Sequence, residues 1–184
     1  MDNGASSYRR FLDGDDSGMA ELIREYKDGL MLYLNSFVND ISAAEDCVQD
    51  TFIRLAVKKP KFRANCTFKT WLFTIGRNIA ISYLRKAKRT HAVSVDEISE
   101  PAAETDLEQD YLKEEQKITV HRAMRRLKPE YAQVLHLTYF EGFTAKETAG
   151  IMKKSGKQIE NLLYSAKKSL RAELEKEGFQ YEDL

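Results

Sequence analysis

Apolar side chains recur at helical spacing along almost the whole chain, and runs typical of β-strands are nearly absent. A first amphipathic helix is predicted around residues 19–37, with Asp16 or Ser17 placed to cap it. Its buried stripe consists of Met19, Leu22, Ile23, Tyr26, Leu30, Tyr33, Leu34 and Phe37. We therefore expect an all-α protein.

A second helix is predicted to begin at residues 42–45, where Ser42 and Glu45 form a capping-box pattern. Its buried side is expected to comprise Val48, Phe52 and Leu55. Another face of the same helix carries a separate line of side chains, Asp46, Gln49, Asp50 and Ile53. This line is either a solvated stripe or a docking surface.

A third helix is predicted over residues 68–89, which contain six Lys or Arg and no acid. Most of its aromatic residues share one face with aliphatic ones, and this face is assigned to the core: Phe68, Trp71, Leu72, Ile75, Ile79 and Tyr83. We expect the polar side chains to point outward: Thr74, Arg77, Asn78 and Arg85. The four cations Arg85, Lys86, Lys88 and Arg89 exceed what helix capping needs, so they indicate a further role.

The formal net charge of zero for the 184 residues hides two opposite segments. Residues 51–95 contain eleven Lys or Arg and no acid, whereas residues 96–115 contain nine acids and one Lys. A long basic segment without compensating acids favours a polyanionic partner such as nucleic acid over a merely solvated face. The acidic segment, poor in large apolar residues, is predicted to be a linker.

The amino-acid composition narrows the class of protein further. The apolar content of 42% is sufficient for one or two small cores, and neither a membrane-spanning run nor a signal peptide is present, so we expect a cytoplasmic protein. Cys47 and Cys66 are too few for a disulfide framework and are expected to be reduced. We expect no metal, cofactor or catalytic constellation.

Two consecutive capping boxes lie near the C-terminal end, Thr144 to Glu147 and, eleven residues later, Ser155 to Gln158. A short helix, a tight turn and a second helix make up a helix-turn-helix, although any helical hairpin has a similar pattern. Residues Ile159, Leu163, Ala166 and Leu170 are predicted to be buried on the second helix. The exposed face then carries Lys157, Gln158, Glu160, Asn161 and Tyr164.

Three blocks of the chain resemble signature blocks of the extracytoplasmic-function sigma factors, the small promoter-specificity subunits of bacterial RNA polymerase. They read SAAEDCVQDTFIRLA, FKTWLFTIGRNIAISYLRKAKR and LKPEYAQVLHLTYFEGFTAKETAGIM, in the order and spacing of that family. The resemblance implies sigma region 2 over residues 1–92, an acidic linker over residues 93–114, and sigma region 4 over residues 115–184.

The resemblance also implies which residues act in each region. Docking on the clamp of the largest polymerase subunit would use Asp46, Gln49, Asp50, Ile53 and Arg54. Contact with the minus-ten element, including a pocket for a flipped base, would use Phe62, Arg63, Ala64, Asn65, Cys66, Thr67, Thr74, Arg77, Asn78, Arg85, Lys86, Lys88 and Arg89. Contact with the minus-thirty-five element would use Ser155, Lys157, Gln158, Glu160, Asn161, Tyr164, Lys167 and Lys168.

The predicted recognition helix departs from the family pattern, because Glu160, Leu162 and Ser165 occupy positions where Lys or Arg is common. Its base preference is therefore not carried over. The implied partners are core RNA polymerase, through the clamp and through the flap of the second subunit, promoter DNA, and an anti-sigma factor, which in this family can be membrane-bound. The alternative is a DNA-binding regulator with an N-terminal sensing or dimerisation domain.

Overall fold

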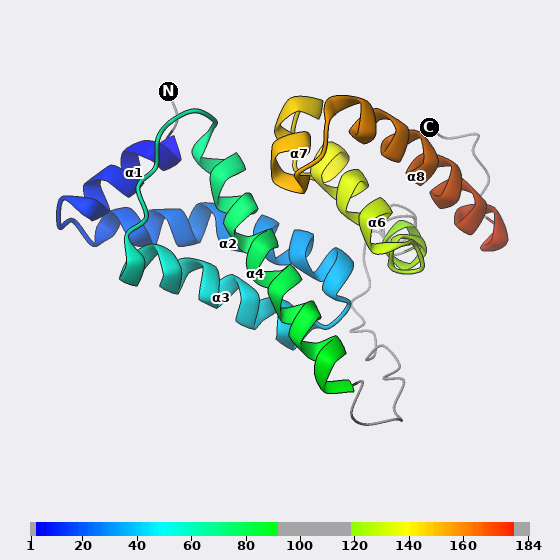
Figure 1. Cartoon of the computed structure of the whole chain (residues 1–184), viewed down its shortest axis with the longest axis horizontal. Helices are drawn as coiled ribbons and strands as arrows, with labels where there is room; N and C mark the ends of the chain where they lie inside the picture. Colours follow the sequence, from blue (N-terminus) through cyan, green and yellow to red (C-terminus); the bar gives the residue numbers. More distant parts are fainter. Residues whose placement is uncertain (1–2, 92–118, 179–184) are drawn as a thin grey trace, which may run out of the picture.

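The computed structural model describes residues 3–91 and 119–178, and its regular elements within these ranges are all helices (Figure 1). The expectation of an all-α protein is confirmed. The N-terminal half contains α1 (Asn3–Leu12), α2 (Ser17–Val38), α3 (Ile41–Lys58) and α4 (Phe68–His91). The C-terminal half contains a helical segment at residues 119–125, α6 (Pro129–Leu135), the π-helix η1 (His136–Phe140), α7 (Ala145–Met152) and α8 (Gly156–Lys176).

The core of the N-terminal half lies where α2, α3 and α4 pack together. The predicted stripes supply it: Leu30 and Leu34 of α2, Leu55 of α3 and Leu72 of α4 are fully buried. Burial of a side chain of this size contributes about 1.5–3 kcal/mol, so this cluster is the main source of stability for the half. Two predicted core positions are wrong, because Ile23 and Tyr83 are each 38% exposed.

The first helix, α1, was not predicted from the pattern. It packs on α2 through Tyr8 and Phe11, and its close approach requires Gly18, where a Cβ atom would lie 2.2 Å from the backbone oxygen of Ser7. The Tyr8 hydroxyl donates to the backbone oxygen of Pro60 at 2.8 Å. Burial raises the pKa of Tyr8 to about 12. This side chain therefore ties α1 to the segment between α3 and α4.

The N-terminal caps of two helices differ from those predicted. At α2, the carboxylate of Asp15 accepts from the backbone N–H of Ser17 at 3.0 Å, and Asp16 makes no side-chain cap bond. At α3, Asp40 accepts from the backbone N–H of Ala43, so the helix begins before Ser42. A carboxylate directly before the helix satisfies the exposed amides, so the predicted box is not needed.

The C-terminal half contains the predicted helix-turn-helix, α7 followed by α8. Both capping boxes are confirmed, with reciprocal bonds between Thr144 and Glu147 and between Ser155 and Gln158. Between them, α7 ends at Met152, and the left-handed backbone of Lys153 (φ 55°) turns the chain toward α8. Ile159 and Ala166 are buried and Leu163 and Leu170 half-buried, as the periodicity predicts.

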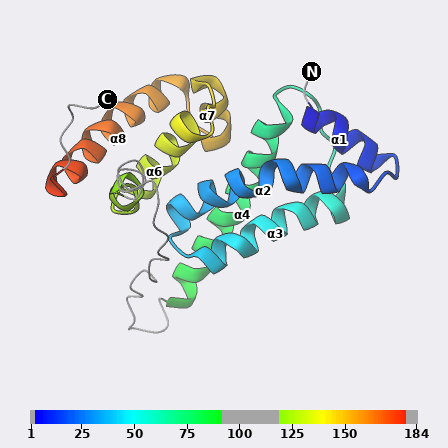
Figure 2. The same cartoon turned by 180° about the vertical axis from the view of Figure 1, so that it is seen from behind.

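The two halves lie against each other, with α6 beside α2 and α7 beside the N-terminal part of α4 (Figures 1 and 2). Their buried side chains form one continuous cluster, which joins Phe73 of α4 to Phe143 with ring centroids 5.1 Å apart. The sequence predicted two helical units but not this packing. The predicted linker, residues 93–114, lies outside the described residues.

Candidate nucleic-acid and polymerase interfaces

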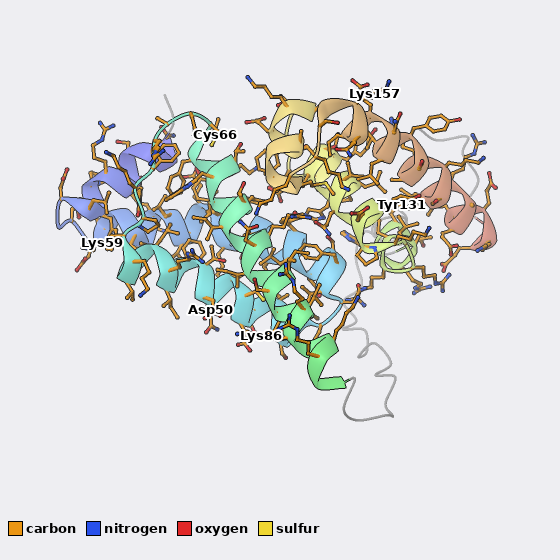
Figure 3. All side chains as sticks on the ribbon, viewed as in Figure 1. Asp50, Lys59, Cys66, Lys86, Tyr131 and Lys157 are labelled. Atoms are coloured by element: carbon orange, nitrogen blue, oxygen red, sulfur yellow. The ribbon has the colours of Figure 1, made fainter. Side chains whose placement is uncertain are left out.

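The polar stripe of α3 is exposed along its length. Asp46, Gln49, Asp50, Ile53 and Arg54 all lie on the surface, opposite the buried Val48, Phe52 and Leu55. Ile53 is 54% exposed, and Val57, which the sequence analysis did not single out, is 69% exposed beside it in the helical register. Acidic groups around exposed apolar side chains are typical of a surface that another protein covers. Asp50 marks this surface in Figure 3.

The segment between α3 and α4 is anchored at one point and exposed at others. The Phe62 ring packs on Phe68 and Trp71, with centroid distances of 5.7 and 5.2 Å. Arg63, Ala64, Asn65 and Thr67 are exposed, Cys66 is half-buried, and Ala64 has a left-handed backbone (φ 52°). Of the residues predicted to form the base pocket, Phe62 thus holds the segment, while the polar side chains of Arg63 and Asn65 are exposed beside it.

The polar side of α4 differs from the prediction at Thr74 and Arg77. The Thr74 hydroxyl donates to the backbone oxygen of Thr70 at 2.7 Å. Arg77 does not point into solvent; its Nε donates to Oε1 of Gln133 on α6 at 2.8 Å. This correction arises because α6 of the other half lies beside this part of α4. Asn78 is half-buried.

The C-terminal end of α4 presents the predicted cluster of cations. Arg85, Lys86, Lys88 and Arg89 are all exposed, and Figure 3 shows Lys86 near this end of the helix. Cations at a helix C-terminus interact favourably with the helix dipole, which contributes about 0.3–1 kcal/mol each. Four of them within five residues also make a positive surface suited to phosphate groups.

The N-terminal part of α8 presents the predicted polar face. Lys157, Gln158, Glu160, Asn161 and Tyr164 are exposed, as are Lys167 and Lys168, and Lys157 stands on the outer side of the helix in Figure 3. Ser155 and Gln158 are committed to the cap, where Oε1 of Gln158 accepts from the backbone N–H of Ser155 at 2.8 Å. Gln158 therefore keeps its amide N–H groups and one further lone pair on Oε1 for another partner.

The atypical positions of α8 have a structural reason. Leu162 packs against the core cluster and Ser165 is half-buried, so neither position is on the fully exposed face. Lys167 lies over the ring of Tyr139, 5.3 Å from its centroid. The lack of Lys or Arg at Leu162 and Ser165 therefore removes little charge from the outer surface of α8. Glu160, by contrast, is exposed and lowers the positive potential of that surface.

Comparison with known proteins identifies the family. The family model of sigma-70 region 2 matches residues 22–90, and that of sigma-70 region 4 matches residues 117–170. The ECF RNA polymerase sigma factor SigM of Bacillus subtilis is 29% identical over 155 residues, 83% of this chain and 92% of its own. SigW of the same organism is 25% identical over 170 residues, 88% of this chain and 91% of its own.

The chain belongs to the extracytoplasmic-function branch of the sigma-70 family. This sigma factor recognises promoters and supports transcription initiation. Region 2 matches most of α2, all of α3 and almost all of α4, so the N-terminal half is not a sensing or dimerisation domain of a simple regulator. Sigma factors are initiation factors rather than catalysts.

Solved structures show the same fold. The sigma factor RpoE of Bartonella quintana, in complex with the anti-sigma factor NepR, superposes with a TM-score of 0.71 at 24% identity, over 85% of this chain and 96% of that chain. CnrH in complex with the cytosolic domain of CnrY gives a TM-score of 0.63 at 22% identity, over 94% of this chain and 95% of that chain.

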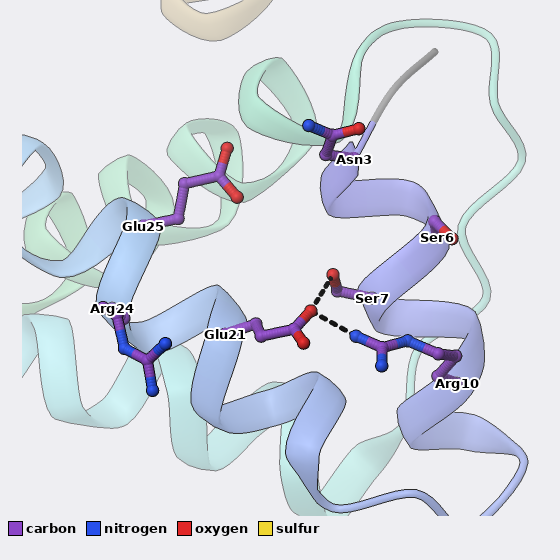
Figure 4. A pocket seen from close by; sticks show the side chains of 7 residues that line it. All are labelled: Asn3, Ser6, Ser7, Arg10, Glu21, Arg24 and Glu25. Carbon is purple, nitrogen blue, oxygen red and sulfur yellow. Dashed lines mark hydrogen bonds and ion pairs between the residues drawn. The ribbon is translucent and has the colours of Figure 1, made fainter.

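A cleft between α1 and α2 offers no second site for the sigma factor. Three of its polar side chains pair with one another: Glu21 accepts from Ser7 at 2.8 Å and from Arg10 (Figure 4). The hydrogen bond from Arg10 lowers the pKa of Glu21, with a second bond from Ser7 in the same direction. These contacts hold α1 on α2, at a place that the region 2 match does not include.

Two other kinds of site are missing from the described part of the chain. Residues 3–91 and 119–178 bring no three His, Cys, Asp or Glu together in a way that could hold a metal ion. None of the helices in these ranges is long and apolar enough to cross a membrane.

Proposed function

We propose that the α3 stripe of Asp46, Gln49, Asp50, Ile53 and Arg54 docks this sigma factor on the clamp of the largest polymerase subunit. The exposed Ile53 and Val57 would supply apolar area, while the surrounding acids would set the register and speed the encounter with a basic partner. The observation that carries this assignment is that the stripe is fully exposed on a helix matched by region 2.

The docking proposal is tested by reversing one charge. Asp50→Arg is expected to weaken binding to core RNA polymerase at least about tenfold, or about 1.4 kcal/mol, because the introduced cation would meet a positive surface. Binding is measured by fluorescence anisotropy of labelled sigma factor. Asp28→Arg, an exposed reversal on α2, is the matched control and should bind as the wild type does. Equal affinities of all three proteins would remove the docking assignment.

For the minus-ten element, the proposed contacts are the segment from Phe62 to Thr67, together with Thr74, Arg77 and Asn78 and the cations Arg85, Lys86, Lys88 and Arg89. The cations would neutralise phosphates of the non-template strand. The polar groups beside Asn78 would hold a base that has left the base stack of the DNA. Capture of this base requires no chemical reaction by the protein. Thus the basic segment and the aromatic core of α4 have separate tasks.

For the minus-thirty-five element, we place α8 in the major groove with Asn161 and Glu160 at base edges and Lys157, Lys167 and Lys168 at phosphates. Asn161→Ala should then change the relative use of upstream sequence variants by roughly 1–3 kcal/mol, whereas Lys168→Ala should weaken all variants alike. Transcription from a promoter library, read by sequencing, measures both. A uniform loss for Asn161→Ala would contradict base recognition.

The remaining assignments concern organisation and partners. We divide the chain into residues 1–92 for region 2, 93–114 for a linker and 115–184 for region 4, with the flap of the second polymerase subunit as a further contact of region 4. Because RpoE and CnrH were solved with anti-sigma partners, an anti-sigma factor is proposed here too, and it can be membrane-bound. The sigma factor itself would act in the cytoplasm and catalyse no reaction. Co-purification with core polymerase and with captured partners tests these points.

A further inference from the structure

The helix α1 precedes the region 2 match, which begins at residue 22, yet it packs against the segment between α3 and α4. Figures 1 and 2 show this segment running beside α1. The Tyr8 ring centroid lies 5.5 Å from those of both Phe68 and Trp71. Phe62 of the segment packs on the same two rings. We call these four side chains the aromatic cluster, and α1 and the segment both belong to it.

Two further contacts join α1 to the start of the segment. The Tyr8 hydroxyl donates to the backbone oxygen of Pro60 at 2.8 Å. The Nζ atom of Lys59 lies over the ring of Phe11, 5.0 Å from its centroid. Lys59 itself has a left-handed backbone (φ 43°), with which α3 ends. The first two residues after α3 are therefore both held by α1.

The position of α1 on this cluster is tightly fixed. A Cβ atom at Gly4 would lie 2.6 Å from the Phe68 ring and 2.6 Å from the Tyr26 hydroxyl. Such distances are too short for carbon atoms in contact, so the lack of a side chain at Gly4 allows the helix to lie this close. The other close approach of α1, at Gly18, fixes it on α2. The helix thus has little freedom to shift relative to α4.

The hydroxyl of Tyr8 makes a directional contact that its ring does not. The side chain is only 1% exposed, so packing of the ring would be nearly the same with Phe in its place. Because burial raises the pKa of Tyr8 to about 12, the hydroxyl keeps its proton at neutral pH and donates to Pro60. This bond fixes the orientation of one peptide group at the point where the segment leaves α3.

The middle of the segment depends on such anchors. Arg63, Ala64 and Asn65 are exposed, and Ala64 has a left-handed backbone (φ 52°), which is unfavourable for a residue with a Cβ atom. Phe62 holds the chain before these residues. After them, Oγ1 of Thr67 accepts from the backbone N–H of Thr70 at 3.2 Å. The conformation of residues 63–65 is therefore imposed from its two ends.

We propose that Tyr8 is a positioning residue for promoter melting: through Pro60 and the aromatic cluster, it holds residues 63–65 in the conformation that receives the flipped base. This inference rests on the proposed minus-ten function. A pocket that is already ordered loses less conformational entropy when it binds its ligand. It also presents its polar groups in one arrangement, so it distinguishes better between bases. Tyr8 itself contacts no DNA.

The test removes the hydroxyl and keeps the ring. Tyr8→Phe is compared with Tyr131→Phe, the same change on α6 of the other half. Holoenzyme with each variant transcribes a promoter library in which the minus-ten element is randomised, and sequencing gives the preference among the four bases at each position. Because this preference is a ratio within one protein, a smaller folded fraction leaves it unchanged. A merely structural role of Tyr8 would therefore not alter it.

We expect Tyr8→Phe to reduce the preference at the captured base roughly fivefold, the effect of about one hydrogen bond. Preferences in the minus-thirty-five element and affinity for core polymerase should equal those of the wild type and of Tyr131→Phe. Gly4→Ala is a second variant that leaves the hydroxyl in place. It should favour the helix but displace α1 from Phe68, and so reduce the same preference. Circular dichroism checks that each variant is folded.

Asn65→Ala, a change in the exposed part of the segment, separates the two proposals in the same library. If Asn65→Ala alters the base preference while Tyr8→Phe and Gly4→Ala do not, Tyr8 is not a positioning residue and the base pocket stands. A uniform loss of transcription by Tyr8→Phe, without a change in preference, would likewise reduce Tyr8 to a stabilising role. If none of the three variants alters the preference, the proposed base pocket fails, and the role of Tyr8 fails with it.

Discussion

Asn78 is the residue whose proposed task depends most on a single side chain. It is half-buried on α4, and the hydroxyl of Ser82 donates to its backbone oxygen at 2.8 Å, a bond that does not involve the Asn78 side chain. Asn78→Ala should therefore leave the fold intact, since Ala favours a helix. We expect holoenzyme with this variant to form roughly tenfold fewer open complexes, because one hydrogen bond to a captured base is lost.

Permanganate reactivity of unpaired thymines measures the open complexes formed with Asn78→Ala. Ser82→Ala, one turn further along α4, is the matched control and should open promoters normally. A promoter with a mismatch bubble should restore part of the defect, since the cost of unstacking no longer has to be met. If Asn78→Ala opens duplex promoters as well as the wild type, Asn78 is not part of a base pocket.

Periodicity predicted the exposure of single residues well for a helix that other helices cover on one side only. The α3 stripe is exposed because α3 is covered on one side only, and its acids follow the 3.6-residue repeat. On α4 the same reasoning placed Arg77 in solvent and left Phe73 out of the core, although Phe73 is fully buried. Phe73 packs on Tyr33 and Phe143, so α4 is covered on a second side by the C-terminal half.

At the scale of elements, the capping box of α8 gives a measurable test. Ser155→Ala removes the acceptor for the backbone N–H of Gln158 and should lower the free energy of unfolding by about 1 kcal/mol. Ser155→Asn supplies another good capping oxygen and should be nearly neutral. Urea denaturation followed by circular dichroism measures both. Equal stability of Ser155→Ala and the wild type would mean that the cap contributes nothing to α8.

The helices that were predicted and the one that was missed differ in how their apolar residues are buried. The Thr144 and Ser155 boxes lie next to clear apolar runs, so the local pattern alone fixes where α7 and α8 begin. The helix α1 offers only Tyr8 and Phe11 as buried large apolar residues in a mostly polar segment. These two side chains are buried by elements far along the chain, which a local pattern does not reveal.

At the scale of the whole molecule, the arrangement of the two halves could not be derived from periodicity. The deciding contacts join Arg77 to Gln133 and Tyr33 to Gln133, which are 56 and 100 positions apart. Gln133, Glu141 and Glu147 look like ordinary solvated residues in the sequence, and only Glu147 has a local signal, its capping box. The exposed face of α8 and the basic end of α4 were predictable from charge and helix face, and residues 62–67 were named only through the family resemblance, whereas the contacts of Thr67 and Arg77 with the C-terminal half required coordinates.

The contact between the two halves should respond to pH through two carboxylates, Glu141 beside Lys69 and Glu147 beside Thr70. Burial alone would raise the pKa of Glu141, but Lys69 and His136 hold it below its ordinary value of 4.5. Burial likewise acts against the hydrogen bonds from Thr144, Thr70 and Thr67, which lower the pKa of Glu147. Because these pKa values are lowered, the ionised carboxylates stabilise the contact between the two halves at pH values above the ordinary carboxyl pKa. This contribution is lost as the pH falls through the lowered pKa.

The groups that face Glu141 determine where this loss begins. Lys69 lies on α4, Glu25 and Tyr26 line the same pocket from α2, and Nε2 of His136 is 3.7 Å from the Glu141 carboxylate. The contact between the two halves should therefore weaken where Glu141 and Glu147 become protonated.

We expect the radius of gyration of the wild-type sigma factor to stay constant from pH 7 down to about the ordinary carboxyl pKa and to increase below it. Far-UV circular dichroism, recorded on the same samples, separates opening from loss of helices. The variant with both Glu141→Gln and Glu147→Gln lacks the two carboxylates that pair with α4, so its radius of gyration should show no such step over this range. A step of equal size in that variant would assign the pH response to other groups, and a more compact wild type at low pH would contradict the sign of the argument.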